Sequence, residues 1–306
     1  MASISNRLLR EPASQSLAAA TPSRWRRTWQ RVRRQRLMLL GLVIFLAIIA
    51  ITIAAPLIAP RSPEQQQVTW RLKPPGSQNP DGSVNWLGTD QLGRDVLSRT
   101  VYGGRLSLVI ALTSAIVAGL VGLLFGLLAG YFGGAIGVIV GRLSDLQLAL
   151  PLVLVALVIV GLIGSSLRNI VLVFIVTSWP AYARMIRAST MRVKHMDFVE
   201  AGHALGARTP QILRRHIFPN VLTSLIVLAS FDVSRMIQLE ASLGFLGLGV
   251  QPPTPTWGNM LADGRGYLTT AWWIATFPGI AIVLTSAAVN FIGDGLRDIL
   301  DPRMTT

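Results

Sequence analysis

Six stretches of the chain are apolar and long enough to cross the hydrocarbon core of a membrane. A helix rises about 1.5 Å per residue, so one crossing needs roughly 20 residues with few charges. The fourth stretch is the shortest and contains Pro180 near its end. The pattern predicts an all-α polytopic membrane protein with six transmembrane helices, at 37–59, 106–131, 146–164, 169–183, 221–239 and 272–291.

The composition supports lipid as the solvent for much of the chain. Hydrophobic residues make up 51% of the sequence and charged residues only 14%, with a mean hydropathy of +0.53. Soluble domains carry about 25% charged residues. The sequence has no cysteine, which excludes a disulfide framework and a thiolate metal site within this chain.

The formal net charge of +14 is almost wholly due to arginine, since Lys73 and Lys194 are the two lysines. These arginines border the apolar runs and do not alternate with exposed aromatic residues, so membrane topology explains them better than nucleic-acid binding. Positive charge in short loops favours the cytoplasmic side. With both termini cytoplasmic, nineteen basic residues fall inside, eight fall outside, and Arg235 lies within a span. The basic loop after the fourth span is then cytoplasmic.

The spans divide the chain into five regions. Trp25, Trp29 and Val32 share one helical face among arginines, which predicts an elbow helix lying on the inner leaflet. The alternative for that segment is a disordered basic tail. The predicted regions are a cytoplasmic tail with this elbow at 1–36, an anchor at 37–59, an external loop at 60–105, a core at 106–293 and a cytoplasmic tail at 294–306.

A stripe of small residues follows one face of the second span. Gly122, Gly126 and Gly130 recur every fourth position, with Ala118 one step earlier. Small residues at this spacing let helix backbones approach closely in lipid. The stripe therefore predicts tight packing without identifying the helix that packs there.

The loop at 190–220 carries the signals of a short helix. Asp197 followed three residues later by Glu200 has the spacing of a capping box, and Gly206 is suited to end a helix in the left-handed conformation. These signals predict a helix at 198–205. A rigid helix could transmit a push from a cytoplasmic partner, whereas the alternative is an amphipathic hairpin resting on the membrane surface.

A second helix is predicted directly after the first. Thr209 is placed to cap it, with Pro210 at its first position, and Pro219 is expected to end it before the fifth span begins.

The fifth span contains charges that lipid should exclude. An ionisable residue inside a span suggests a function, because its exposure costs roughly 2.5 to 3.5 kcal/mol even on the lenient insertion scale. The candidates for a translocation path are Asp232, Arg235 and Glu240. The alternative is that Asp232 and Arg235 form an i, i+3 ion pair that neutralises itself.

Glu200-Ala201, Gly206 and the later run His216-Ile217-Phe218-Pro219 resemble the coupling-loop signature of integral membrane subunits of ABC importers. That signature reads Glu-Ala-Ala, then Gly, then Ile-x-Leu-Pro. This chain departs from it at Gly202, His216 and Phe218, which are small or apolar positions of the motif. The departures put the local packing in doubt.

Three further segments resemble one subfamily, the C-type permease subunit of bacterial dipeptide and oligopeptide ABC importers. They are 87–99, 243–253 with the following Trp257-Gly258, and 290–303. This resemblance implies the type I importer permease fold in the bacterial plasma membrane. It also implies a second homologous permease subunit, two ATP-binding subunits and an external substrate-binding protein as partners.

The resemblance assigns the coupling to the ATP-binding subunit to Glu200, Ala201, Gly202, Leu205, Gly206 and Pro219, although Glu200 could serve as a helix cap alone. No phosphate-binding Gly-x-x-x-x-Gly-Lys-Ser/Thr sequence occurs in the chain. We therefore expect no enzyme activity and no cofactor here, with ATP and Mg bound by the partner subunits.

Several alternatives remain at this level. The cargo could be a di- or oligopeptide, or another family cargo such as a nickel chelate, glutathione or an opine. The external loop could contact the binding protein or cover the outer mouth as a lid. A secondary transporter is less favoured, since no internal repeat is evident. A membrane enzyme is also less favoured, because the three histidines, His195, His203 and His216, all lie in the coupling loop.

Overall fold

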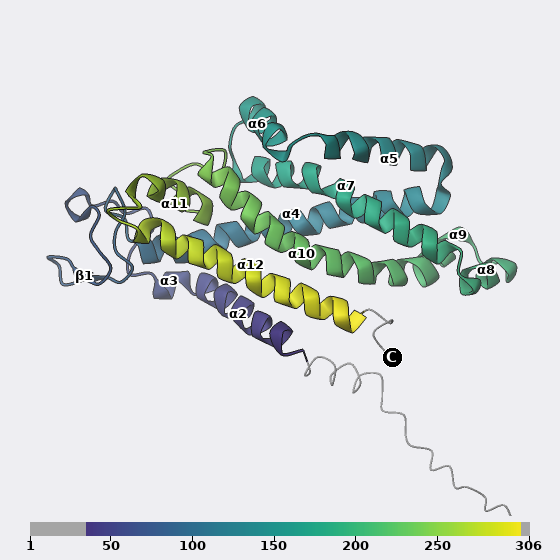
Figure 1. The fold of residues 1–306 in the computed structure, drawn as a ribbon, viewed down its shortest axis with the longest axis horizontal. Helices are drawn as coiled ribbons and strands as arrows, with labels where there is room; N and C mark the ends of the chain where they lie inside the picture. Colours follow the sequence, from purple (N-terminus) through teal and green to yellow (C-terminus); the bar gives the residue numbers. More distant parts are fainter. Residues whose placement is uncertain (1–34, 301–306) are drawn as a thin grey trace, which may run out of the picture.

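The computed structural model describes residues 35–300, which form a bundle of long helices with a two-stranded sheet at one end (Figure 1). This confirms the predicted all-α fold class. The elements in chain order are α2 (Arg36–Ile53), α3 (Ala55–Ile58), η1 (Val68–Trp70), β1 (Ser77–Gln78), β2 (Val84–Asn85), α4 (Val96–Phe132), α5 (Gly134–Ala149), α6 (Leu152–Ile163), α7 (Leu167–Lys194), α8 (Asp197–Ala204), α9 (Thr209–Ile212), η2 (Leu213–Ile217), α10 (Phe218–Phe245), α11 (Trp257–Gly264), η3 (Arg265–Tyr267) and α12 (Trp273–Leu300).

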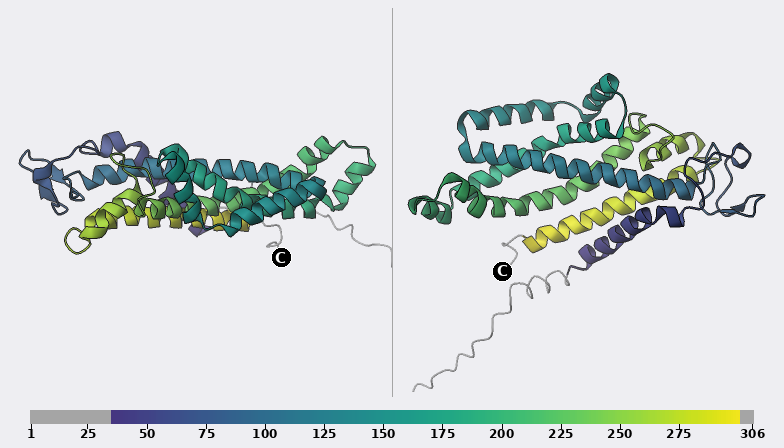
Figure 2. Two further views of the ribbon diagram at one scale, coloured as in Figure 1. Left: turned by 90° about the horizontal axis from the view of Figure 1, so that it is seen from above. Right: turned by 180° about the vertical axis from the view of Figure 1, so that it is seen from behind.

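The bundle has two distinct ends, which we name the strand end and the α8 end. The strand end carries η1 and the antiparallel strands β1 and β2, and the α8 end carries α8 and α9, as Figures 1 and 2 show from three sides. Gln35 Nε2 donates to Asp298 Oδ2 at 3.0 Å. The start of α2 and the end of α12 therefore lie together, and the two helices pack side by side.

Five helices are long and apolar enough to cross a membrane, and the pair α5 and α6 makes a sixth crossing only if it is counted as one span. The two helices of this pair are bent by 90° relative to each other. The prediction of one continuous helix at 146–164 is therefore wrong. Leu150 has an extended backbone with ψ 126° because the ring of Pro151 disfavours the helical conformation of the residue before it.

The ends of the other spans also differ from the prediction. The second span begins at Val96, ten residues early, because Asp95 caps the helix by accepting from Ser98 N at 2.7 Å. The fourth span runs through Pro180 to Lys194. The sixth continues to Leu300, so the predicted tail at 294–306 begins as helix. The predicted elbow helix lies outside the described residues.

The small-residue stripe of α4 packs against α7. A Cβ atom built on Gly126 would lie 2.6 Å from Ile186 Cβ, and one on Gly130 would lie 2.7 Å from Thr190 Cβ. Gly122 meets Tyr182 in the same way. Each α7 residue is four positions after the previous one, so the two stripes match turn for turn. The structure thus identifies the helix that the glycines approach, which the sequence could not name.

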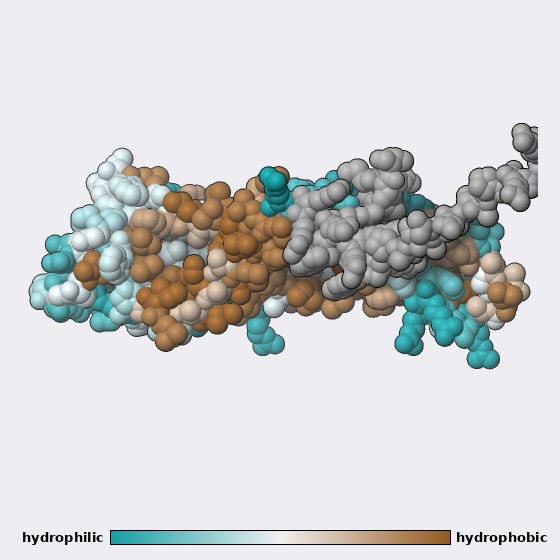
Figure 3. Space-filling view, turned by 90° about the horizontal axis from the view of Figure 1, so that it is seen from below, coloured by the Kyte–Doolittle hydropathy of each residue, from teal (hydrophilic) through white to brown (hydrophobic). Residues whose placement is uncertain are grey.

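The molecular surface agrees with a membrane position for the bundle. Figure 3 shows a broad hydrophobic region between more hydrophilic ends. Exposed side chains of α2, α4, α5 and α6 are also large and apolar, among them Val43, Leu120, Ile139 and Leu154. Such surface is stable only against lipid or another apolar surface.

Candidate functional site

The short helix α8 forms close to its predicted position but without the predicted cap. It begins at Asp197 and ends at Ala204, and no side chain makes a capping hydrogen bond at its start. Asp197 is the first helical residue, after Met196 in the capping position. Asp197 therefore lacks the extended backbone conformation of a capping residue, from which a side chain can reach the free N–H groups of the first turn. The capping-box prediction is wrong, and Glu200 is exposed at the end of the bundle.

The end of α8 follows the prediction. Gly206 has φ +79°, the left-handed conformation that glycine adopts without steric cost. Its N–H donates to His203 O at 3.0 Å, and Ala207 N donates to Gly202 O at 3.0 Å. These two bonds form the Schellman motif, which satisfies the last carbonyls of the helix. The predicted role of Gly206 as a helix terminator is confirmed.

The second predicted helix is the start of a much longer one. Thr209 is its first helical residue and not its cap; the Arg208 N–H instead donates to Gln211 Oε1 at 2.9 Å. Residues 209–245 form one continuous helical run through α9, η2 and α10. Pro219 therefore does not end a helix, contrary to the prediction. The wider π turn of η2 precedes it and replaces the α turn whose carbonyl the proline ring would meet.

The helix α8 is fixed to the bundle by one buried side chain and one aromatic contact. Val199 is fully buried in a cluster with Ile212 and Ile217. The Phe198 ring lies 5.9 Å from the His216 ring, measured between centroids. These contacts join α8 to the run that continues into α10.

A second side of α8, which includes the exposed part of Phe198, presents an apolar face to solvent. Phe198 is 42% exposed, Leu205 is 88% exposed, and Ala201 between them is exposed as well. Their i, i+3, i+7 spacing places them on one side of the helix. An exposed apolar face at the end of a rigid element is typical of a surface that a protein partner covers.

The charges predicted in the fifth span fall into two groups. The Tyr182 hydroxyl donates to Asp232 Oδ2 at 2.9 Å, while Arg235 Nη2 lies 2.7 Å from Asp232 Oδ1. The i, i+3 ion pair that the sequence offered as an alternative is therefore present. Glu240 lies apart from it, buried at the contact of α4, α10 and α11, where Ser107 Oγ donates to its carboxylate at 2.9 Å. Of the three candidates for the path, Arg235 alone is exposed.

Comparison with known proteins identifies the family. The family model described as "Binding-protein-dependent transport system inner membrane component" matches residues 122–306. The chain belongs to this family. A second model, the N-terminal TM domain of oligopeptide transport permease C, matches residues 23–75. The resemblance to C-type permease subunits is thereby confirmed, and the chain is a multi-pass protein of the inner membrane.

The curated relatives cover nearly the whole of this membrane component. The dipeptide transport system permease protein DppC of Escherichia coli K12 is 48% identical over 276 residues, covering 90% of this chain and 92% of the relative. The di/tripeptide transport system permease protein DppC of Pseudomonas aeruginosa UCBPP-PA14 is 42% identical over 283 residues, covering 92% and 93%.

A solved structure shows the same fold. A chain of the MetNI methionine ABC transporter, in an inward facing conformation, is similar with a TM-score of 0.53 and 21% identity. The similarity covers 65% of this chain and 95% of that one. The type I importer permease fold expected from the sequence is confirmed.

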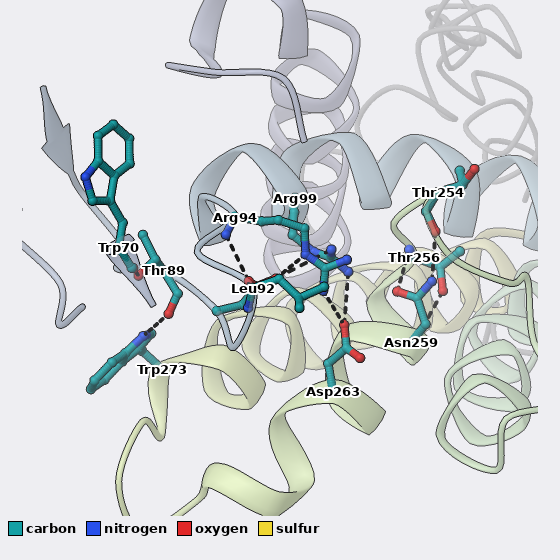
Figure 4. Close-up of polar contacts among 11 residues, drawn as sticks. Trp70, Thr89, Leu92, Arg94, Arg99, Thr254, Thr256, Asn259, Asp263 and Trp273 are labelled. Carbon is teal, nitrogen blue, oxygen red and sulfur yellow. Dashed lines mark hydrogen bonds and ion pairs between the residues drawn. The ribbon is translucent and has the colours of Figure 1, made fainter. Parts of the chain in front are cut away.

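At the strand end, this membrane component holds a buried ion network that the sequence analysis missed (Figure 4). Arg94 Nε lies 2.6 Å from Asp90 Oδ2, and Arg94 Nη2 lies 3.0 Å from Asp263 Oδ2. Arg99 joins the same two carboxylates, with N–O distances of 3.5 and 3.2 Å. The side chains of Arg94 and Arg99 are 3% and 2% exposed.

The network fastens the loop before α4 to α11. Asp90 and Arg94 are four residues apart, a spacing that could have suggested a local pair, but Asp263 is distant in sequence and gave no signal. Trp273 Nε1 also donates to Thr89 O at 3.0 Å. Nearby, burial raises the pKa of Asp95 even though Ser98 donates to its carboxylate.

Proposed function

We propose that this chain is a pore-forming subunit of an ATP-driven importer of di- or oligopeptides. The observation that carries the proposal is the identity of 48% with a dipeptide permease over 90% of this chain. The same family serves other small cargoes, so a nickel chelate, glutathione or an opine is the alternative cargo for the same machinery.

The proposed complex contains this chain, a second homologous permease subunit, two ATP-binding subunits and an external substrate-binding protein. ATP and Mg would be bound by the ATP-binding subunits, and this chain would catalyse no reaction. We assign the α8 end to the cytoplasm together with both termini. The excess of basic residues in the predicted inner loops and the contact between Gln35 and Asp298 support that assignment. The loop at 60–105 then lies on the outer side of the membrane.

Coupling would pass through α8 into the fifth span. The apolar face of Phe198, Ala201 and Leu205 would dock on an ATP-binding subunit, with Glu200 beside it. The packing of Val199 on Ile212 and the unbroken helix from 209 to 245 would transmit a displacement of α8 to α10. Gly202 and Gly206 shape the end of α8, and Pro219 marks the π turn where the run enters the membrane.

The test is uptake of dipeptides into liposomes that contain the complete complex. The charge reversal Glu200→Arg changes an exposed residue and should leave folding intact, and Glu64→Arg is a matched reversal at an exposed residue of the strand end. We expect ATP-dependent uptake in the unaltered complex and in Glu64→Arg, and a strong loss in Glu200→Arg. Uptake driven by an ion gradient without ATP would instead support a secondary transporter.

A second measurement identifies the cargo. The same liposomes are supplied with labelled dipeptides, a nickel chelate and glutathione in separate reactions. Uptake of dipeptides in preference to the other compounds is the expected result, whereas uptake of one of the others alone would replace the peptide assignment and leave the importer assignment standing.

A further inference from the structure

The middle of α10 exposes polar residues where a lipid-facing helix would expose apolar ones. Between residues 227 and 244, the exposed residues of α10 are Arg235, Gln238 and Ser242. They are spaced i, i+3 and i+7, which places them on one face. By contrast, between residues 109 and 124 the helix α4 exposes a stripe of large apolar residues, including Val109, Ile116, Leu120 and Leu124.

This polar face is bordered by α7 and α12, which flank α10 in Figure 1. On the same side of α10, about two to four turns from Arg235 toward the α8 end, lies a cavity of about 620 Å³ between the three helices. Asn220 and Thr223 line it from α10, and Arg192 and Arg297 line it from α7 and α12. A guanidinium exposed to lipid would cost roughly 2.5 to 3.5 kcal/mol on the insertion scale. The polar face and the cavity therefore suit a water-filled route.

Arg235 is held in place on this face by groups behind it. Its Nε donates to Asp232 Oδ1 at 2.8 Å and its Nη2 to Ser178 Oγ at 3.0 Å. Asp232 is buried, with a side chain 6% exposed, whereas the Arg235 side chain is 49% exposed. The carboxylate thus lies inside the subunit and the cation points outward.

The outward part of the guanidinium retains donors for a ligand. Arginine has five N–H donors in a planar fork that fits a carboxylate. Asp232 and Ser178 occupy Nε and Nη2, and within residues 35–300 no hydrogen bond is formed by Nη1. Asp232 is also the sole described carboxylate with an oxygen within 4.0 Å of the Arg235 nitrogens. A second carboxylate could therefore bind from the open side.

We propose that Arg235 binds the carboxylate of the substrate as it passes through the membrane. This assignment rests on the proposed import function and adds a specificity residue to it: the cargo carries a free carboxylate. Asp232 and Ser178 are positioning residues, because they orient the guanidinium and do not face the route. Gln238 lies one turn away on the same face and provides a neutral comparison.

The absence of cysteine in the chain makes a charge-exchange experiment direct. Arg235→Cys, Gln238→Cys and the apolar-surface variant Leu120→Cys are each assembled with all partner subunits. Every complex is treated with charged, membrane-impermeant thiol reagents, and the complex with the unaltered chain serves as the background. We expect labelling at positions 235 and 238 and none at 120.

Uptake of dialanine is then measured before and after labelling, since its one anionic group is the terminal carboxylate. Arg235→Cys should lower ATP-dependent uptake about tenfold, the order expected for losing one charge-assisted contact. A reagent that adds an ammonium group should raise the uptake of Arg235→Cys several-fold, whereas one that adds a sulfonate or a neutral group of similar size should leave it low. At Gln238→Cys the three reagents should act alike.

Two results would overturn the assignment of Arg235. One is the absence of labelling at position 235, which would place it against lipid or a partner subunit. The other is an equal response of Arg235→Cys uptake to cationic, neutral and anionic reagents. If the unaltered complex shows no ATP-dependent uptake, the import function itself fails, and the labelling pattern still reports separately whether the α10 face meets water.

Discussion

The Tyr182 hydroxyl donates a hydrogen bond of 2.9 Å to buried Asp232, while the Cβ of the same residue packs against Gly122. One α7 residue thus contacts α4 with its base and α10 with its tip. Close helix packing on one side and a polar contact on the other place α7 between the two longest helical runs.

The hydroxyl of Tyr182 should contribute to stability apart from its ring. Tyr182→Phe keeps the packing on Gly122 and removes one donor from a buried carboxylate, which should lower the free energy of unfolding by about 1–3 kcal/mol. Thermal denaturation of the purified complex in detergent measures this. Tyr267→Phe is the control, since no hydrogen bond of the Tyr267 hydroxyl is found within the described residues, and it should change stability by less than about 0.5 kcal/mol. Equal effects of the two variants would contradict the assigned role.

The contact between α4 and α7 should not tolerate an added methyl group. In Gly126→Ala the new Cβ would lie 2.6 Å from Ile186 Cβ and 2.7 Å from Ala183 O, so the helices must separate. Overpacking of this kind costs about 1–3 kcal/mol. At Gly161 in α6 no neighbouring atom lies within 4 Å of the added Cβ. Gly161→Ala should instead be neutral or stabilise by up to about 1 kcal/mol, and thermal denaturation compares the two.

Breaking the buried ion network should be far more costly than breaking an exposed pair. Arg99→Met leaves buried Asp90 and partly exposed Asp263 with one cation fewer, for which a loss of about 3–5 kcal/mol is expected. Arg184→Met removes the pair with Asp145, whose side chains are 59% and 63% exposed, and should cost about 0–1 kcal/mol. Denaturation midpoints of the two variants provide the comparison. If Arg99→Met loses no more stability than Arg184→Met, the network does not stabilise the strand end.

Two glycines of the coupling loop should respond in opposite ways to alanine. Gly206→Ala forces a side chain into the left-handed conformation, at about 1 kcal/mol, and should loosen the end of α8. Gly202 is helical, and an added Cβ would lie 3.7 Å from His216 Nε2, an ordinary contact. Gly202→Ala should therefore be tolerated.

The measurement for this pair is the number of peptides imported per ATP hydrolysed. We expect a lower ratio in Gly206→Ala and an unchanged ratio in Gly202→Ala. An unchanged ratio in both variants would argue that the rigidity of α8 does not matter for coupling.

Local chemistry explains which elements could be predicted from the sequence. Gly206 ends α8 because only glycine adopts a φ of +79° at no steric cost, and this requirement is visible in the sequence alone. Hydropathy likewise located the centres of most spans. It failed at their ends, since Asp95 begins α4 through a hydrogen bond and not through apolar character. The break at Pro151 was missed because the apolar run continues through it.

The order of residues alone was enough to predict a polytopic membrane protein with a structured loop before the fifth span. This was possible because the length of an apolar run, the positive charge of a short loop and the left-handed conformation of a glycine each depend on residues that are close together in the sequence. Three relations became visible only in the folded chain: Asp263 joins Arg94 and Arg99, the α4 glycines meet α7, and Arg235 points outward while Asp232 is buried. These relations join helices distant in sequence, and burial and pairing depend on how those helices pack in space.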